Sequence, residues 1–323
     1  MRPWGHNGGR IFAIIGLLAV AAGACAREDS AASGEAASEG SVPASRVVIQ
    51  GSFRSLAARA GQHLVVVTEA PGDIRGRLFR MERVSGVEVG EGVETGGGRD
   101  SGESGAPVEG ASWRQVGAPV PVVVGRSGVG PKQEGDGRSP QGVFALGPVF
   151  GYARAPPTGS VLPGGLALPY EPMPHSAVCV DDVGSAYYTR VFDADTLPEA
   201  GPGAKDWASA EDMRRDLAFG DDLYKWGVVV QYNDGAVPGA GSCIFLHVWR
   251  ALDSPTAGCT AMAEEDLLAL LGWLKRGSVS GPEVESDLGP ERTTGPLLVQ
   301  GTRAYLEDLS GEGVLPYRIP PAP

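Results

Sequence analysis

The chain has 323 residues, in which 39 acidic side chains outnumber 27 lysines and arginines, so the formal net charge is −12 at pH 7. Such an acidic balance argues against nonspecific binding to nucleic acid or to an anionic membrane surface. Only four histidines occur, scattered along the chain without the spacing of a zinc site, so we expect no metal and no cofactor.

The first 25 residues have the pattern of an export signal. Arg2 and Arg10 precede an apolar run over 11–24, which is short for a membrane span and ends in small residues. The run closes on Ala-Gly-Ala before Cys25, which fits either a cleavage site or an imperfect lipoprotein box in which Cys25 is acylated. We favour the lipoprotein interpretation, which would tether the chain to a membrane of the cell envelope. A retained, uncleaved anchor is the alternative.

Residues 26–46 are rich in Ala, Ser, Gly and Glu and show no hydrophobic period, which predicts a disordered linker. Apolar runs at 64–67 and 78–81 flank the turn sequence Pro-Gly-Asp at 71–73, and they predict two paired strands. Residues 90–112 are rich in glycine with almost nothing to bury, so we predict a loop insertion there.

The strand pattern resumes at Trp113. Short apolar runs predict further strands at 120–124, 143–146, 228–231 and 296–300. The Pro- and Gly-rich segment 155–174 predicts only loop, and Ser209 with the residues that follow it predicts a short capped helix. Many short strands with few helices predict a mainly β fold, a sandwich or barrel, in one domain over 47–318 with a tail at 319–323.

The stretch around 243–274 carries the strongest functional signal. The apolar run 243–249 predicts a buried strand that contains His247, and a turn-rich segment then leads to Cys259. From Glu264 the apolar spacing predicts an amphipathic helix with acidic residues in its first turn. A thiol just before a helix, with a histidine on the preceding strand, suits nucleophilic catalysis, because imidazole and helix N-terminus both favour the thiolate. A buried or disulfide-bonded cysteine and a hydrogen-bonded core histidine are the structural alternatives.

Residues near Cys259 are further candidates. Gly258 leaves the backbone uncrowded, so amides beside the sulfur could face a developing oxyanion, and Thr256 could orient the loop by hydrogen bonding. Arg250 could bind a peptide carboxylate or hold the loop, with plain solvation as the alternative. Tyr232 follows a predicted strand and is a weaker candidate for substrate binding, because an ordinary turn explains its position.

His247 and the run Ser-Pro-Thr-Ala-Gly-Cys at 254–259 resemble the active-site motif of the L,D-transpeptidase catalytic domain family (YkuD-like), in which a His precedes Ser/Thr-His-Gly-Cys. The segments 124–130 and 134–144 also resemble this family, whose members often carry a Thr/Ser-Pro-x-Gly-x-Phe hairpin. The similarity extends over roughly 63–316, which is most of the chain after the export signal.

Two positions depart from the family motif. Ala257 stands where the second His is usual, and Ala261 stands two residues after the Cys, where an Arg is usual. Divergent branches of the family tolerate both changes, so the resemblance still implies an L,D-transpeptidase-like β-sandwich or barrel with a few short helices. In the family, the group that orients the catalytic His is commonly a backbone carbonyl.

The resemblance implies an exported cell-wall enzyme. Cys259, deprotonated by His247, would attack the amide after the third residue of a peptidoglycan tetrapeptide stem and form a thioester as D-Ala leaves. An amine on a second stem, or on an envelope protein, would then resolve the thioester. Water as the acceptor would make the same machinery a carboxypeptidase or endopeptidase. A cell-wall-binding module without catalysis is the remaining alternative.

Four cysteines bound the possible disulfides: Cys25, Cys179, Cys243 and Cys259. If Cys25 is acylated or removed and Cys259 is the nucleophile, Cys179 and Cys243 remain, and in an exported protein they could form a bridge. The alternative is a disulfide between Cys259 and either of the other two, which would abolish the nucleophile. The sequence alone does not fix the connectivity.

Overall fold

The computed structural model describes residues 57, 60–84, 112–159, 162, 165–274 and 295–321. The predicted export signal over 1–25 with its Cys25, the predicted linker over 26–46 and the glycine-rich insertion up to residue 111 lie outside these residues.

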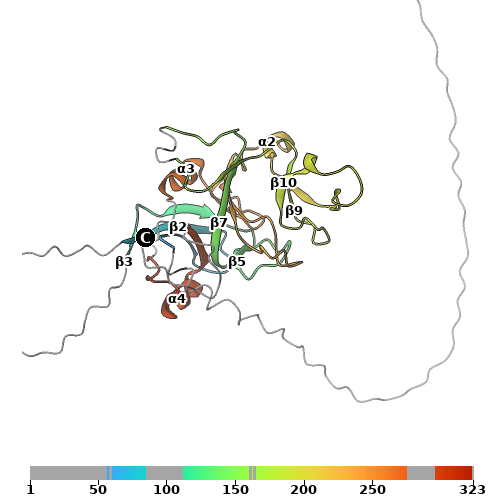
Figure 1. Cartoon of the computed structure of the whole chain (residues 1–323). Helices are drawn as coiled ribbons and strands as arrows, with labels where there is room; N and C mark the ends of the chain where they lie inside the picture. The colour runs from blue at the N-terminus through green and yellow to red at the C-terminus, as the bar shows by residue number, and fades with distance from the viewer. Residues whose placement is uncertain are drawn as a thin grey trace, which may run out of the picture. The chain divides into compact units, whose positions relative to one another are not determined.

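A closed β-barrel is the main body of the described part of the chain (Figure 1). There the main sheet has ten strands, of which β3 (Ser112–Gln115) and β8 (Tyr170–Pro172) lie beside the closed ring, paired with β2 and β7. The others follow around the ring as β1 (Gln62–Thr68), β15 (Leu297–Thr302), β7 (Gly142–Gly151), β12 (Trp226–Val230), β13 (Phe245–Val248), β14 (Thr260–Met262), β4 (Val120–Val123) and β2 (Arg75–Val84). Antiparallel pairing of β1 with β2 closes the ring. The predicted mainly β fold is therefore confirmed, with a barrel as its form.

Smaller elements surround the barrel. A three-stranded sheet has the order β10 (Val191–Asp193), β9 (Ala177–Val180), β11 (Ala210–Asp212), and a two-stranded sheet joins β5 (Val129–Gly130) to β6 (Ser139–Pro140). The helical elements are η1 (Ala194–Thr196), α2 (Arg215–Ala218), α3 (Glu264–Trp273) and α4 (Arg303–Gly311). Figure 1 shows β9, β10 and α2 grouped beside the barrel, away from α4.

Two element predictions are corrected by the structure, and one helix was not predicted. The segment after Ser209 was expected to be a capped helix, but its first part is strand β11, because its backbone pairs with β9, and helix α2 begins only at Arg215 without a side-chain cap. The segment 155–174 was expected to be only loop, yet it contains β8, an edge strand paired with β7. Helix α4 was not predicted; the Thr302 side chain caps it by accepting from the Tyr305 N–H.

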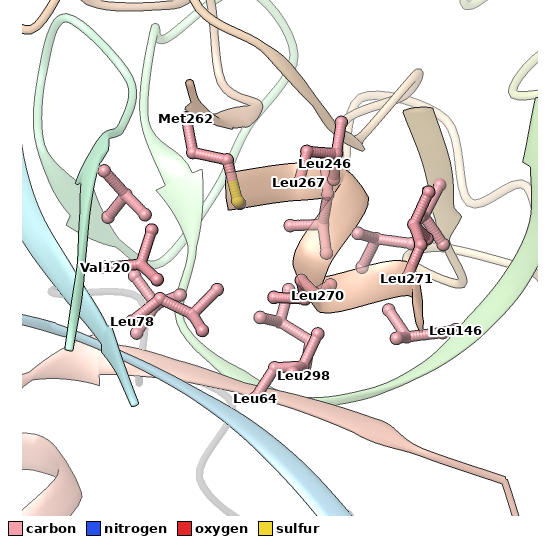
Figure 2. Close-up of a cluster of buried hydrophobic side chains, with 14 of the residues drawn as sticks. Leu64, Leu78, Val120, Leu146, Leu246, Met262, Leu267, Leu270, Leu271 and Leu298 are labelled. Carbon is pink, nitrogen blue, oxygen red and sulfur yellow. The ribbon is translucent and has the colours of Figure 1, made fainter. Parts of the chain in front are cut away.

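Alternation along the strands divides the hydrophobic core between two faces. In β1, Leu64 and Val66 point to a cluster that contains the buried leucines of α3, whereas Val65 and Val67 point to a cluster that contains Leu306 of α4. Figure 2 shows α3 lying among strand residues of the first cluster. Full burial of one such leucine contributes roughly 1.5–3 kcal/mol, so α3 is an integral part of the barrel core.

The same alternation in β13 fixes the position of His247. Leu246 and Val248 face the cluster around α3, so Phe245 and His247 point to the opposite side. A third cluster on that side contains Phe245 and Cys259. Strand β14 runs parallel to β13, with Ala261 opposite His247. The loop between them must therefore run back to the end of the barrel where β13 begins, and it reaches Cys259 there.

Candidate active site

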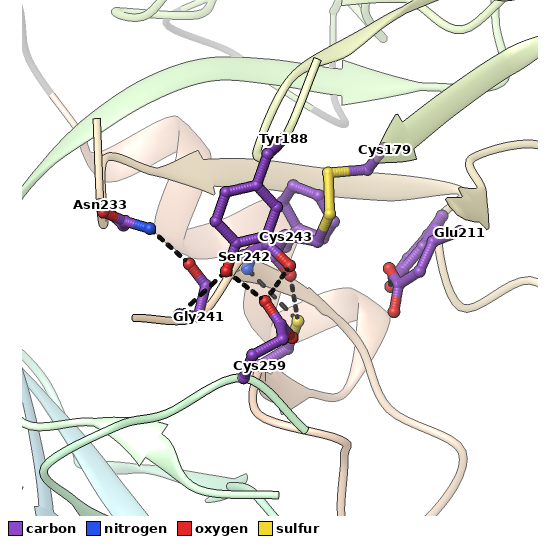
Figure 3. The surroundings of a disulfide bond; sticks show 11 residues. Cys179, Tyr188, Glu211, Asn233, Gly241, Ser242, Cys243 and Cys259 are labelled. Atoms are coloured by element: carbon purple, nitrogen blue, oxygen red, sulfur yellow. Dashed lines mark hydrogen bonds between the residues drawn. A yellow bond between two sulfur atoms is a disulfide. The ribbon is translucent and has the colours of Figure 1, made fainter. Parts of the chain in front are cut away.

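The thiol of Cys259 lies buried at the start of β14, with its residue only 6% exposed. Its sulfur accepts a hydrogen bond from the Phe245 N–H at 3.3 Å, and it lies 3.4 Å from the carbonyl oxygen of Cys243, to which the S–H donates (Figure 3). The first residue of β13 and Cys243, two residues before this strand, thus hold the sulfur from two directions. Cys259 is the free cysteine of the described residues.

The imidazole of His247 is held by a main-chain carbonyl. Its Nδ1 lies 2.8 Å from the carbonyl oxygen of Val248. When Nδ1 carries the proton and donates it to Val248, Nε2 is the unprotonated nitrogen and is available as a base. The edge of the Tyr224 ring packs against the imidazole at a centroid distance of 5.1 Å and further fixes its plane.

His247 and Cys259 open into one cavity of about 190 Å³. Its wall is completed by charged, polar and small side chains from several elements: Glu211, Arg215, Leu223, Tyr224, Trp249, Arg250, Ser254, Pro255, Thr256, Ala257 and Ala261. The two alanines that depart from the family motif, Ala257 and Ala261, are therefore both at the cavity, where they leave room that larger side chains would fill.

Burial sets the resting protonation of both groups. It raises the pKa of the Cys259 thiol to about 12, with the Glu211 carboxyl adding to the rise, while the Phe245 N–H favours the thiolate without offsetting the burial. Burial also lowers the pKa of His247 to about 4. A neutral thiol beside a neutral imidazole is therefore the resting state, so the proton would move only as the sulfur forms a new bond.

The loop before Cys259 is held by hydroxyl groups. Thr256 Oγ1 donates to the Cys259 carbonyl at 2.6 Å and accepts from the Gly258 N–H at 3.1 Å, and Ser139 Oγ donates to the same carbonyl at 2.9 Å. The Gly258 amide, which the sequence suggested for an oxyanion, is thus occupied. Within the described residues no hydrogen bond engages the Cys259 amide, so that N–H is the better oxyanion donor.

Gly258 lies where a side chain would not fit. A Cβ added there would lie 3.0 Å from the carbonyl oxygen of Arg138 and 3.0 Å from Nζ of Lys132. The Lys132 side chain is itself only 3% exposed and pairs with Asp136 at 3.2 Å. Close packing of this buried ammonium against the backbone explains glycine at this position.

Cys179 and Cys243 form a disulfide. Cys179 belongs to β9 of the three-stranded sheet, and Cys243 lies two residues before the start of β13. The bridge therefore fastens the three-stranded sheet to the main-chain segment that holds the thiol of Cys259 (Figure 3).

The remaining candidates from the sequence divide between the cavity and other places. Arg250 lines the cavity and pairs with Asp221 at 3.1 Å. Tyr232 does not line it, because its hydroxyl donates to the Ala240 carbonyl at 2.7 Å and its ring packs edge-on against Phe144. Cys25 lies outside the described residues.

Four residues of the cavity wall were not predicted from the sequence: Glu211, Arg215, Leu223 and Tyr224. They come from β11, α2 and the segment before β12, and no local motif marks them. Their approach to Cys259 depends on the pairing of β11 with β9 and on the disulfide at Cys179, which are long-range contacts.

Comparison with known proteins identifies the family that the sequence motif resembles. A family model described as the L,D-transpeptidase catalytic domain (YkuD) matches residues 112–285, a range that includes His247 and Cys259. No curated protein and no solved structure gives a significant match. Over the described residues, no three or more His, Cys, Asp or Glu side chains are grouped to hold a metal ion, and no helix has the length and hydropathy to cross a membrane.

Proposed function

The chain belongs to the L,D-transpeptidase catalytic domain family, as its motif suggested, and from this premise we propose that it is a cysteine-dependent acyltransferase acting on peptidoglycan stem peptides. The observation that carries the proposal is the shared cavity of Cys259 and His247. A thiol held by the Phe245 N–H and an imidazole held through Nδ1 are the two groups that such chemistry requires.

The proposed reaction begins with proton transfer to His247. Nε2 takes the thiol proton as the sulfur of Cys259 attacks the carbonyl carbon of the third stem residue, in the amide that joins it to D-Ala, and the resulting oxyanion is stabilised by the Cys259 N–H. The imidazolium then returns the proton to the leaving amine, so D-Ala departs and a thioester remains. An amine of a second stem attacks the thioester, loses its proton to His247, and the thiol is restored.

Two arginines support recognition of an anionic peptide end. The Asp221 carboxylate pairs with Arg215 at 2.7 Å and with Arg250 at 3.1 Å, so two guanidinium groups share one carboxylate. The Asp221 carboxylate therefore neutralises only one of these two guanidinium charges. Arg250, whose side chain is 59% exposed, is the one free to bind the terminal carboxylate of the acyl donor.

The proposed location is the cell envelope, on the periplasmic or extracytoplasmic face of the membrane. The export-signal pattern over 1–25 supports secretion, and acylation of Cys25 would tether the domain near its polymer substrate. The Cys179–Cys243 disulfide agrees with an oxidising compartment.

Mass spectrometry of muropeptides tests the proposal. Purified protein is incubated with disaccharide-tetrapeptide, and the wild type is compared with Cys259→Ala, with His247→Ala, and with His175→Ala, whose exposed imidazole lies outside the cavity. A cross-linked dimer with loss of D-Ala in the wild type and in His175→Ala, but in neither of the other variants, is the expected result. Tripeptide without dimer would indicate water as the acceptor, and intact muropeptides with a free thiol would refute the substrate assignment.

A further inference from the structure

Glu211 and Tyr224 line the cavity but have no role in the proton transfers proposed above. The Tyr224 hydroxyl donates to Oε2 of Glu211 at 2.8 Å, and Tyr224 lines the same cavity and packs in the same buried cluster as Cys259, where it favours the thiolate. One hydroxyl is therefore bound to the carboxyl group of Glu211 at the wall of the cavity that also contains the sulfur. Figure 3 shows Glu211 beside the disulfide, in agreement with its register opposite Cys179.

A tyrosine hydroxyl has one proton to donate, so it cannot donate to both neighbours at once. If Glu211 is ionised, it can only accept, and the Tyr224 proton is directed to the carboxylate. If Glu211 is protonated, its own O–H can donate to the Tyr224 oxygen, and the Tyr224 proton is then free for the sulfur. The protonation state of the carboxyl group thus decides which way the hydroxyl donates.

We propose that Glu211 is a positioning residue that acts on Cys259 through Tyr224: protonated Glu211 frees the Tyr224 hydroxyl to donate to the sulfur as it becomes a thiolate, and ionised Glu211 withdraws that hydrogen bond. This inference rests on the proposed role of Cys259 as nucleophile. It makes reactivity of the thiol depend on retention of a proton by a carboxyl group whose own hydrogen-bond partner is Tyr224.

The surroundings keep the Glu211 carboxyl poised for this role. Burial raises its pKa, and the carboxylates of Asp181 and Glu134 raise it further, whereas the Tyr224 hydroxyl and the Arg215 guanidinium favour the ionised form. Around the sulfur, the charged groups are Glu211, which disfavours the thiolate, and Lys132, which favours it. As pH rises, ionisation of Glu211 removes a donor from the sulfur and adds a negative charge near it, so both changes oppose thiolate formation.

Alkylation of the thiol tests this without any substrate. The full chain, with its disulfide oxidised, is treated with iodoacetamide across a pH series, and modification of the Cys259 peptide is timed by mass spectrometry. In Glu211→Gln the side chain is neutral at every pH but keeps a donor for Tyr224. The Cys259 thiol of this variant should therefore titrate about one pH unit lower than in the wild type, which gives about tenfold more thiolate at pH values below the titration. Tyr224→Phe alone should slow alkylation at the acidic end of the series and change it least at the alkaline end.

The double variant separates the bridge from simple removal of a charge. In Tyr224→Phe, the additional Glu211→Gln change should shift alkylation by clearly less than it does in the wild type, because only removal of the charge remains and the donor is gone. A full shift in that background, or identical titrations of Glu211→Gln and wild type, would overturn the proposal. Matched controls are Glu69→Gln, an exposed carboxylate paired with Arg303, and Tyr170→Phe, whose hydroxyl binds the Ala153 carbonyl. A loss of muropeptide turnover with the predicted alkylation shifts intact would count against the substrate and not against this bridge.

Discussion

The carbonyl oxygen of Cys243 lies 3.4 Å from the sulfur of Cys259, so the disulfide-bonded cysteine holds the free one. Cys243 adopts a φ of +54°, a left-handed conformation that a residue with a side chain rarely takes. Its carbonyl is therefore aimed by a backbone conformation that needs support from its surroundings. The bridge to Cys179 in β9 provides part of that support.

Removal of this disulfide should lower both stability and thiol positioning. The variant Cys179→Ala/Cys243→Ala avoids a free Cys243 that could pair with Cys259. Because the bridged residues are 64 apart in sequence, the free energy of unfolding should fall by about 2–4 kcal/mol, measured by denaturant titration. Reductant should destabilise the wild type and leave the variant unchanged. Equal unfolding midpoints for the two oxidised proteins would contradict this account.

Stability should decline on mild acidification because two buried histidines are neutral in the folded protein. Burial lowers the pKa of His63 to about 3 and of His247 to about 4, from an unfolded value of 6.5. Below pH 6.5 the unfolded chain therefore binds protons that the folded chain does not, and stability falls as pH drops. Between that pH and about 4 the expected slope is about 1.4 kcal/mol per pH unit for each histidine.

Chemical denaturation at a series of pH values measures this slope. His63→Gln should remove one histidine's share, since His63 lies in β1, away from the cavity, with its Nδ1 2.6 Å from the Tyr317 hydroxyl. His175→Gln removes an exposed histidine and should keep the wild-type slope. If the free energy of unfolding of His63→Gln depends on pH as steeply as that of the wild type, His63 does not contribute to the loss of stability in acid.

Crowding at Gly258 should lower the reactivity of the Cys259 thiol more than the stability of the fold. In Gly258→Ala the new methyl group would press on the Arg138 carbonyl and on Nζ of Lys132, each 3.0 Å away, and would shift the loop that carries Cys259. We expect acylation of Cys259 to slow by about tenfold or more, because a small misplacement of the nucleophile is costly. The rate is measured by intact-mass spectrometry with a carbapenem, a β-lactam that should acylate the proposed nucleophile Cys259 and leave a mass adduct. Gly61→Ala is the control, since a Cβ at Gly61 has nothing within 4 Å, and equal rates for both variants would refute the crowding argument.

Local sequence patterns predicted the strand with His247, the turn-rich loop and the helix after Cys259, because each depends on short-range periodicity and turn chemistry. The two apolar runs before residue 82 likewise formed the expected hairpin, β1 with β2. The wall with Glu211 and Tyr224 was not predictable in this way. An acidic tripeptide that forms a strand only by pairing with β9 has no periodicity of its own, and its helix prediction failed for that reason.

Arg250 should contribute to binding of the acyl donor and not to the resting structure. Its partner Asp221 keeps Arg215 when Arg250 is removed, so Arg250→Gln should fold as the wild type does. Loss of a guanidinium that binds a carboxylate at an open cavity should weaken donor binding by about 1.5–3 kcal/mol, which is seen as a higher KM with a smaller change in kcat. Arg114→Gln, which removes an exposed arginine paired with Glu82 outside the cavity, is the matched control.

A donor that lacks its terminal carboxylate, such as an amidated tetrapeptide, should bind wild type and Arg250→Gln equally. If Arg250→Gln instead lowered kcat at constant KM, the guanidinium would be acting on the transition state, and its assignment to the donor carboxylate would be wrong.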